Sequence, residues 1–330
     1  GELISAHNYV RVNWATHIDM ETGRPVLDSA GMYWKSPPGT TSLLWPNMWG
    51  AHSSQPMAFH PELGLAYIPA IDIPQVIQYL GDDDTRDTPA VLDEVDGKPH
   101  VPGKLIAWDP RTQTERWSAD HAVPFNGGVL ATAGNLVFQG DAEGRFSARD
   151  AADGRLLWSA DTGSAITAAP VSYRVNGRQR ILLPVGAGSA MQFSYPALHS
   201  GRNAHGPTRL MSFSLAGNTD MPKVMPTVRT LPDPPDQQAS AETIRRGGEL
   251  FSEHWCKGCH GKGAVARRGG SVPDLRYASD ETFLQWNGIV IGGARRSKGM
   301  PAFEMSTEEA EAIRAWVISR AHDLAAGKPE

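Results

Sequence analysis

A short motif that recurs about every 40 residues constrains the fold of the first 220 residues more than any other feature. Its two clear copies begin at Ala107 and Ala148, 41 residues apart, and each ends in a tryptophan, Trp117 or Trp158. A weaker third copy lies at residues 19–23. A period near 40 with strand-like segments is typical of β-propeller blades, so we expect propeller blades here.

The chemistry of the motif predicts a tight turn between two strands. Its aspartate, Asp109 or Asp150, can cap the turn amides, and a glycine such as Gly154 can take a positive φ. The tryptophan is then expected to pack flat between adjacent blades. Apolar runs at residues 65–69, 136–140 and 181–185 predict the clearest strands. WD40 repeats lack this order of residues.

A second motif, Cys256-Lys257-Gly258-Cys259-His260, has the C-x-x-C-H pattern of a c-type haem attachment site. Its thiols would bind the haem covalently, and His260 would ligate the iron. A zinc site would need two more ligands at metal spacing, and a redox pair would need a βαβ context. Neither is found, and no other cysteine remains for a disulfide.

The residues around this motif predict a small helical domain. A helix capped by Ser240 is expected over residues 241–254, and a last helix is expected from Ser306. Between them, Met300 lies on a Gly-Met-Pro loop and is the expected sixth iron ligand, since a thioether raises the reduction potential. Met305 is the nearest alternative. This order of elements resembles class I cytochrome c domains.

That resemblance also implies the surroundings of the iron ligands. In such domains the carbonyl group at the position of Pro273 accepts a hydrogen bond from the proximal histidine and fixes its ring. His254 and His322 are expected on the surface or in packing roles, not as ligands.

Composition argues against a nucleic-acid partner and against a membrane-spanning segment, and the haem motif suggests a location. The net charge of −5 gives no basic surface for a nucleic acid. No apolar stretch approaches the ~20 residues that span a bilayer. Because covalent haem attachment generally takes place outside the bacterial cytoplasm, a periplasmic or membrane-face location is expected.

The repeat as a whole resembles the tryptophan-docking motif of the eight-bladed propellers of pyrroloquinoline quinone (PQQ) dehydrogenases. The segments 12–25, 55–70, 105–110 and 126–134 fit this family as well. A propeller followed by a cytochrome c is similar to a quinohaemoprotein alcohol dehydrogenase. The implied fold is mainly β plus all-α, with a partial PQQ-type propeller over residues 1–217. A proline-rich linker at 218–240 and a class I cytochrome c domain at 241–330 would follow.

The resemblance also implies a larger whole. Gly1-Glu2-Leu3-Ile4 matches the tail of a docking motif, and family members carry roughly twice this much propeller. The catalytic Asp base, most Ca²⁺ ligands and a vicinal disulfide are then expected outside this chain. We expect a C-terminal fragment of a longer chain; pairing with a second polypeptide is the alternative. Either way, the fragment alone is expected to be inactive.

The positions expected to face PQQ differ from the family pattern. Ser53 and Ser54 stand where Asn-Trp or Ser-Trp is common, and Ser189 and Ala190 replace an aromatic in the last blade. These changes are compatible with a roomier substrate pocket, or with weaker PQQ binding or drift. Asn126 is expected near the propeller axis, or in a turn at a strand end. His52 is a packing residue or a contact, and an insert loop at 71–98 would line the pocket.

The resemblance implies oxidation of an alcohol at PQQ and Ca²⁺, with electrons leaving through haem c. The acceptor would be a blue-copper protein, a cytochrome or a quinone. One alternative is an electron carrier with a degenerate, non-catalytic propeller, which the serines at 53 and 54 motivate. Another is a structural or adhesive propeller, in which the haem motif would have no purpose.

Overall fold

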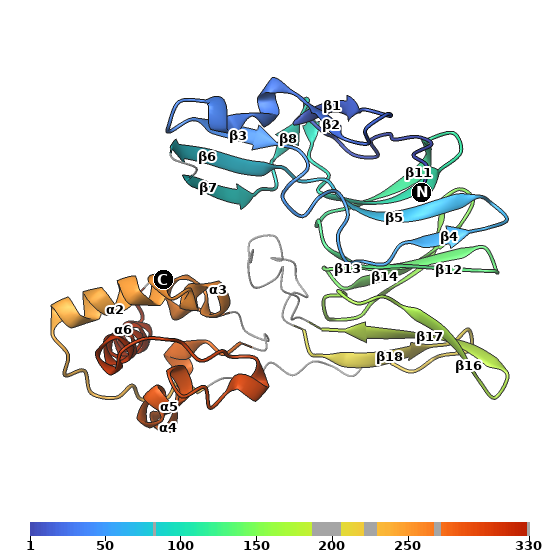
Figure 1. Cartoon of the computed structure of the whole chain (residues 1–330). Coiled ribbons are helices and arrows are strands. Elements are labelled where there is room, and N and C mark those ends of the chain that lie inside the picture. The colour runs from blue at the N-terminus through green and yellow to red at the C-terminus, as the bar shows by residue number, and fades with distance from the viewer. Residues whose placement is uncertain (82–83, 187–205, 221–229, 267–271, 329–330) are drawn as a thin grey trace. The chain divides into compact units, whose positions relative to one another are not determined.

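The computed structural model describes residues 1–81, 84–186, 206–220, 230–266 and 272–328. They form two compact units, one holding all the strands and the other holding the α-helices. Both units are drawn in Figure 1.

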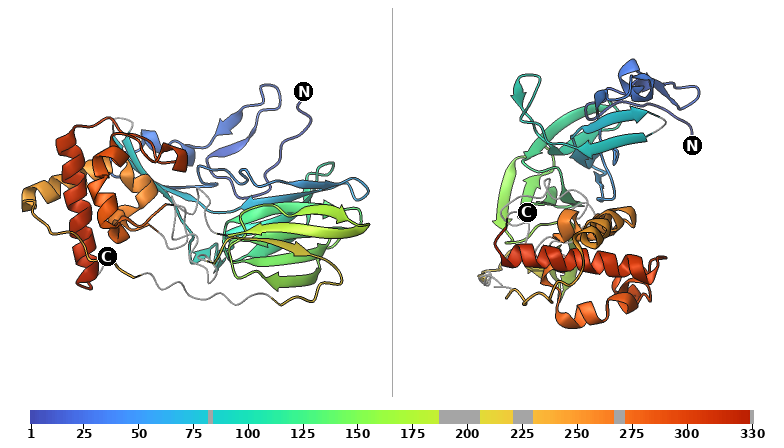
Figure 2. Two further views of the ribbon diagram at one scale, coloured as in Figure 1. Left: turned by 90° about the horizontal axis from the view of Figure 1, so that it is seen from below. Right: turned by 90° about the vertical axis from the view of Figure 1, so that its left-hand side faces the viewer.

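The described part of the first unit is built from antiparallel sheets (Figures 1 and 2). Two of them have four strands, in the orders β11-β10-β5-β4 and β12-β13-β14-β15, and the next has the order β16-β17-β18. Three smaller sheets among the described residues have the orders β1-β2, β3-β6-β7 and β8-β9. This arrangement confirms the predicted propeller blades.

The described residues of the first unit form short strands and two short 3₁₀ helices. They are β1 (Ala15–Ile18), β2 (Pro25–Leu27), η1 (Ser29–Gly31), η2 (Tyr33–Lys35), β3 (Thr41–Leu44), β4 (Ala58–His60), β5 (Leu65–Ile71), β6 (Gln75–Gly81), β7 (Asp84–Pro89), β8 (Glu94–Val95), β9 (Lys98–Pro99), β10 (Gly103–Asp109), β11 (Thr114–His121), β12 (Asn126–Thr132), β13 (Leu136–Asp141), β14 (Arg145–Asp150), β15 (Leu156–Asp161), β16 (Val171–Val175), β17 (Arg178–Val185) and β18 (Arg209–Phe213). The three strands predicted most clearly correspond to β5, β13 and β17.

The turns of the repeat have the predicted chemistry. The Asp109 carboxylate accepts the backbone N–H of Arg111 at 3.0 Å, and Asp150 accepts that of Ala152 at 2.9 Å. Gly154 has a φ of 75°, and Gln113, which replaces this glycine in the other copy, has a φ of 57°. Each aspartate thus closes the turn from within its own motif, so the turn forms from local sequence.

The two motif tryptophans have different surroundings. The indole N–H of Trp117 donates to the Ala151 carbonyl at 3.1 Å, and a Cβ added at Gly154 would lie 2.5 Å from the Trp117 ring. Trp117 therefore packs against the turn of the next blade, as predicted. Trp158 is 42% exposed and meets Phe146 and Phe213 edge-on, with Phe213 contributed by the following sheet.

The segment at 71–98 is not the simple insert loop that the sequence suggested. It contains β6 and β7, and β6 also pairs with β3. Within β6, buried Gln75 and Ile77 alternate with half-buried Val76 and Gln78. This period of two is typical of a strand, and β6 and β7 form a three-stranded sheet together with β3.

The second unit is a cluster of helices around one apolar core. Its elements are α2 (Ala241–Glu253), α3 (Cys256–His260), η4 (Lys262–Ala264), η5 (Leu275–Tyr277), α4 (Asp280–Leu284), α5 (Trp286–Val290), η6 (Arg296–Lys298) and α6 (Thr307–Ala325). The helices α2 and α6 cross closely, because a Cβ at Gly247 would lie 2.5 Å from the carbonyl carbon of Ala312. Beside the crossing, the rings of Phe251 and Trp316 pack with centroids 4.6 Å apart.

Both long helices begin as predicted. The Ser240 hydroxyl accepts the N–H of Thr243 at 3.1 Å, which caps α2. Ser306 and Glu309 form a reciprocal capping box at the start of α6, with bonds of 3.1 and 2.8 Å. Among the described residues, no helix is long and apolar enough to cross a membrane.

Candidate functional site

The two cysteines and the histidine of the C-x-x-C-H motif lie on the five-residue helix α3. Trp255, just before this helix, has a left-handed φ of 60°. Its ring lies over Gly258, where an added Cβ would be 2.5 Å from the indole. The glycine between the cysteines therefore leaves room for this aromatic ring.

The thiols of Cys256 and Cys259 are free, and the two differ in burial. Cys256 packs against the helical core, and burial raises the pKa of its thiol to about 11. Cys259 is exposed. The two cysteines thus lie at the sequence spacing that thioether attachment to haem requires.

His260 is held in one orientation by a backbone carbonyl group. The side chain is 8% exposed, and its Nδ1 lies 3.0 Å from the carbonyl oxygen of Pro273. Since a carbonyl oxygen only accepts, Nδ1 carries the proton and Nε2 is the remaining donor atom for a metal. Burial lowers the pKa of His260, an effect that the Pro273 hydrogen bond and the Asp274 charge oppose. A lowered pKa favours the neutral imidazole that ligates iron.

A buried ion pair follows Pro273 directly. Asp274 and Arg276 are 6% and 7% exposed, and the carboxylate accepts from the guanidinium Nη2 at 2.9 Å. This pair was not predicted from the sequence. The sequence shows an aspartate and an arginine two residues apart, which is compatible with an ion pair. Their burial, however, depends on the packing of η5 against α6.

Met300 lies on a loop tied to its surroundings by backbone bonds. Its N–H donates to the Arg295 carbonyl at 3.3 Å, and Phe303 N–H donates to the Val290 carbonyl at 2.9 Å. The half-buried side chains of Met300 and Met305 both pack against the same core as Cys256. Two thiols, an imidazole nitrogen and a thioether in one small unit fit the donor set of haem c.

Of the other histidines in this unit, His322 bonds elsewhere. Its Nε2 lies 2.8 Å from the Pro235 carbonyl oxygen. His254 is the residue that ends α2, and it is half-buried. Among the described residues, no three His, Cys, Asp or Glu side chains form a group that could hold a metal ion.

In the first unit, Asn126 begins β12 and is 3% exposed. Its Oδ1 accepts the N–H of Gly128 at 2.8 Å, which is the turn role that the sequence allowed. Its buried Nδ2 has no hydrogen-bond partner within the described part of the chain. A buried donor without a partner is costly, so this amide group is available to a bound acceptor.

The start of the neighbouring sheet lies against Asn126. Val129 N–H donates to the Pro56 carbonyl at 2.9 Å, and a Cβ at Gly128 would lie 2.5 Å from the Pro56 ring. Just before Pro56, the buried Oε1 of Gln55 also lacks a partner among the residues described. Gln55 was not predicted as a site residue, since only the contact between blades shows its relation to β12.

The other positions expected to face PQQ are less constrained. Ser53 is half-buried and Ser54 is exposed. His52 Nε2 lies 2.7 Å from the carbonyl oxygen of Gln55, which is a packing contact. Ser189 and Ala190 lie outside the described residues. The unpartnered Nδ2 donor of Asn126 fits a polar cofactor with carbonyl or carboxylate groups, whereas the Oε1 acceptor of Gln55 needs a hydrogen-bond donor.

Propeller blades followed by a helical unit with a C-x-x-C-H site are the combination expected from the resemblance to quinohaemoprotein alcohol dehydrogenases. Comparison with known proteins agrees. Residues 102–185 match the PQQ_2 family model, described as outer membrane protein assembly factor BamB. Residues 242–317 match a cytochrome c family model described as cytochrome c oxidase, cbb3-type, subunit III.

Relatives of known activity match nearly the whole chain. It is 35% identical to quinohemoprotein alcohol dehydrogenase ADH IIB of Pseudomonas putida, over 98% of this chain and 47% of that protein. It is 36% identical to lupanine 17-hydroxylase [cytochrome c] of a Pseudomonas species, over 97% and 46%. The solved structure of ADHIIG from Pseudomonas putida HK5 superposes with a TM-score of 0.78 at 35% identity, covering 99% of this chain and 49% of that one.

These matches relate the chain, along nearly its whole length, to quinohaemoprotein alcohol dehydrogenases and confirm the predicted resemblance and fold. The chain spans about half the length of the curated relatives it matches. The relatives carry different substrates in their names, so the matches do not select one alcohol.

Proposed function

We propose that the protein containing this chain oxidises an alcohol with PQQ and Ca²⁺ and passes the electrons through haem c to an external acceptor. Cys256 and Cys259 would attach the haem, and His260 and Met300 would ligate its iron. The observation that carries this proposal is the contact between His260 Nδ1 and the Pro273 carbonyl oxygen, which leaves Nε2 for the metal. The similarity to quinohaemoprotein alcohol dehydrogenases supports the reaction class.

The chain would be organised as three parts. A PQQ-type propeller part covers 1–217, a proline-rich linker covers 218–240 and a cytochrome c domain covers 241–330. The linker contains Pro222, Pro226, Pro232, Pro234 and Pro235. A proline-rich composition is typical of a spacer between domains.

In the mechanism, PQQ supplies the oxidation chemistry when bound, and the protein supplies position and insulation. The free Nδ2 of Asn126 would donate a hydrogen bond to a PQQ oxygen. Ser53 and Ser54 would face the cofactor from the neighbouring blade, and Ser189 and Ala190 would do so from the last blade. In the cytochrome domain, the Met300 thioether would keep the reduction potential high.

The remaining blades would supply what this chain does not assign, namely the catalytic base, most Ca²⁺ ligands and a vicinal disulfide. Uncovered apolar side chains on the last described sheet, Val171, Val175 and Leu210, support further blades, because an open sheet favours pairing with more chain. These blades would belong to the same chain or to a second one. Without them this part is expected to be inactive.

The protein would work in the periplasm, as covalent haem attachment suggests. Its electron acceptor would be a blue-copper protein, a soluble cytochrome or a membrane quinone.

The test uses the native protein with added PQQ and Ca²⁺ under anaerobic conditions. A short primary alcohol should reduce the c-type haem, seen as sharpening of its visible bands. Reduction by dithionite but not by alcohol would contradict the dehydrogenase proposal and leave an electron carrier. As a site control, Asn126→Ala should weaken PQQ binding roughly tenfold, because it removes a buried donor worth about 1–3 kcal/mol.

A further inference from the structure

The buried pair Asp274–Arg276 lies beside the carbonyl group that holds His260. Asp274 Oδ1 accepts the backbone N–H and the Nε–H of Arg276 at 3.0 and 3.1 Å. Asp274 Oδ2 accepts from Nη2 at 2.9 Å. The aspartate therefore receives three bonds from one residue, two of them in the fork geometry that arginine forms with a carboxylate.

A buried ion pair of this kind contributes little net free energy to folding. Both side chains are at least nine-tenths buried, and desolvation offsets much of the attraction between buried charges. Apolar residues of similar volume would often give equal or greater stability at these two positions. Its place in the fold points to another role.

The three bonds also fix the backbone next to His260. Asp274 follows Pro273, and its carbonyl oxygen accepts the N–H of Tyr277 at 3.2 Å. The short helix η5 that begins here packs on α6. The peptide plane of Pro273 is thereby tied at its C-terminal side, and the direction of its carbonyl group toward His260 is set.

Charges of both signs lie near the His260 ring. The carboxylate of Asp274 and the guanidinium of Arg295 act on it with opposite sign. Arg295 donates to the Thr282 hydroxyl at 3.5 Å. It is left unchanged in the variants of Asp274 and Arg276 described below. Arg276 pairs with the Asp274 carboxylate, so it offsets part of the negative charge that this carboxylate places beside the histidine.

We propose that Asp274 and Arg276 are a positioning pair, which holds the Pro273 carbonyl on His260 and sets the reduction potential of the haem iron through their opposite charges. This inference rests on the proposed function, since it needs haem on Cys256 and Cys259. The oxidised haem carries one more positive charge than the reduced haem. Removing the negative partner therefore favours reduction, and removing the positive partner favours oxidation.

The test is an equilibrium redox titration of the full chain with covalently attached haem, followed by visible absorption. Asp274→Asn should raise the midpoint potential and Arg276→Gln should lower it. Each shift should be on the order of tenfold in the ratio of reduced to oxidised haem at fixed potential, or ~59 mV for one electron.

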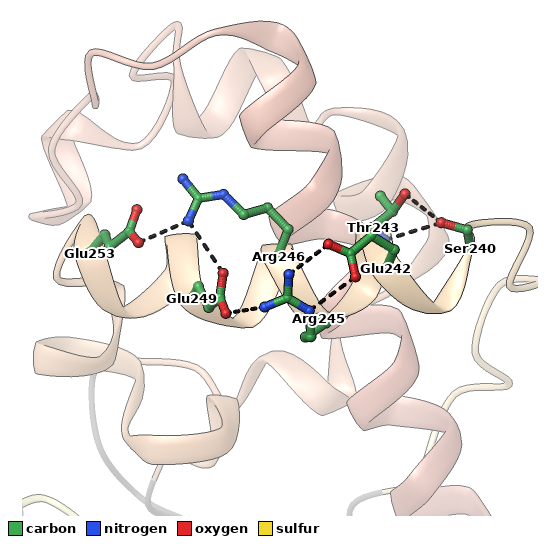
Figure 3. Close-up of polar contacts among 7 residues, drawn as sticks. All are labelled: Ser240, Glu242, Thr243, Arg245, Arg246, Glu249 and Glu253. Carbon is green, nitrogen blue, oxygen red and sulfur yellow. Dashed lines mark hydrogen bonds and ion pairs between the residues drawn. The ribbon is translucent and has the colours of Figure 1, made fainter.

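A matched control removes the same charge from the surface of the same unit. Glu242 is bonded to Arg245 on the exposed face of α2, in the network with Arg246, Glu249 and Glu253 (Figure 3). Its side chain is 74% exposed, so solvent screens its charge. Glu242→Gln should leave the midpoint potential within a few millivolts of wild type, about 1.2-fold at 59 mV per decade.

Arg276→Lys separates position from charge and is the milder variant if the others fold poorly. It keeps the positive charge but loses the fork. The potential should stay near wild type, while the Nδ1–H of His260 should exchange several-fold faster in NMR. Shifts of equal sign in Asp274→Asn and Arg276→Gln, or none, would overturn the inference while covalent haem still supports the proposed function. A wild-type chain without covalent haem would overturn the proposed function and this inference with it.

Discussion

The crossing of α2 and α6 makes a prediction that can be worked out from one glycine. Gly247 lies in the interior of α2, and a Cβ there would overlap the carbonyl group of Ala312 and lie 3.0 Å from the Trp316 Cβ. Gly247→Ala gains about 1 kcal/mol of helix propensity. Against this, overpacking costs typically about 1–3 kcal/mol, and a clash with backbone cannot be relieved by turning a side chain. The cost should therefore lie in the upper half of that range, about 2–3 kcal/mol, which leaves a net loss of about 1–2 kcal/mol.

The assay is thermal unfolding of the full chain, with hydrogen exchange of α2 and α6 assigning the transition to the helical unit. For a unit of this size, 1 kcal/mol shifts Tm by about 4–8 °C, so Gly247→Ala should lower Tm by roughly 5–15 °C. Gly288→Ala is the matched control, because Gly288 is also helical and nothing lies within 4 Å of its added Cβ. It should leave Tm unchanged or raise it. If both variants behave alike, the close helix crossing is wrong.

Three further predictions concern the blades. Trp117→Ala should destabilise the first unit by about 3–5 kcal/mol in chemical denaturation, whereas Trp158→Ala should cost clearly less because that ring is 42% exposed; equal losses would contradict the packing of Trp117 between blades. Tyr67→Phe should cost about 0.5–1.5 kcal/mol, because the Tyr67 hydroxyl donates to the Ala151 carbonyl at 2.8 Å. Burial raises the pKa of Tyr67 to about 12, so the folded state keeps its proton longer than the unfolded state, and wild-type stability should fall as pH rises from about 10 to 12. That fall should be smaller in Tyr67→Phe, and an unchanged pH profile would refute the assignment.

Features set by neighbouring residues in the chain were predictable. Asp109 and Asp150 cap amides two residues away, so the turn motif carries its own structure. The helix caps at Ser240 and Ser306 act over three residues. Each of these signals needs no knowledge of the rest of the fold, and all of them are present in the structure.

Features set by distant packing were not predictable. The two copies of the motif are alike in sequence, but Trp117 meets the turn at Gly154 whereas Trp158 meets the ring of Phe213 from the following three-stranded sheet. The strands β6 and β7 lie where a loop was expected, because β7 is polar and mostly exposed and the sheet depends on the pairing of β6 with the distant strand β3.

The candidate site likewise contains some features that the sequence predicted and others that depend on distant packing. The position of Pro273 relative to His260 follows from a family resemblance, and the structure places a 3.0 Å contact there. The unpartnered side-chain atoms Asn126 Nδ2 and Gln55 Oε1 lie on segments that meet between blades although they are about 70 residues apart in the chain. The role of Asp274 depends on burial against α6, which no local pattern shows.

The most direct test of the central claim is the mass and visible spectrum of the protein produced with the cytochrome c maturation machinery. Intact-chain mass spectrometry should show one covalently bound haem per chain, with a c-type absorption spectrum. The haem should be lost when both Cys256 and Cys259 are replaced by alanine. A folded wild-type chain that carries no covalent haem under these conditions would contradict the account.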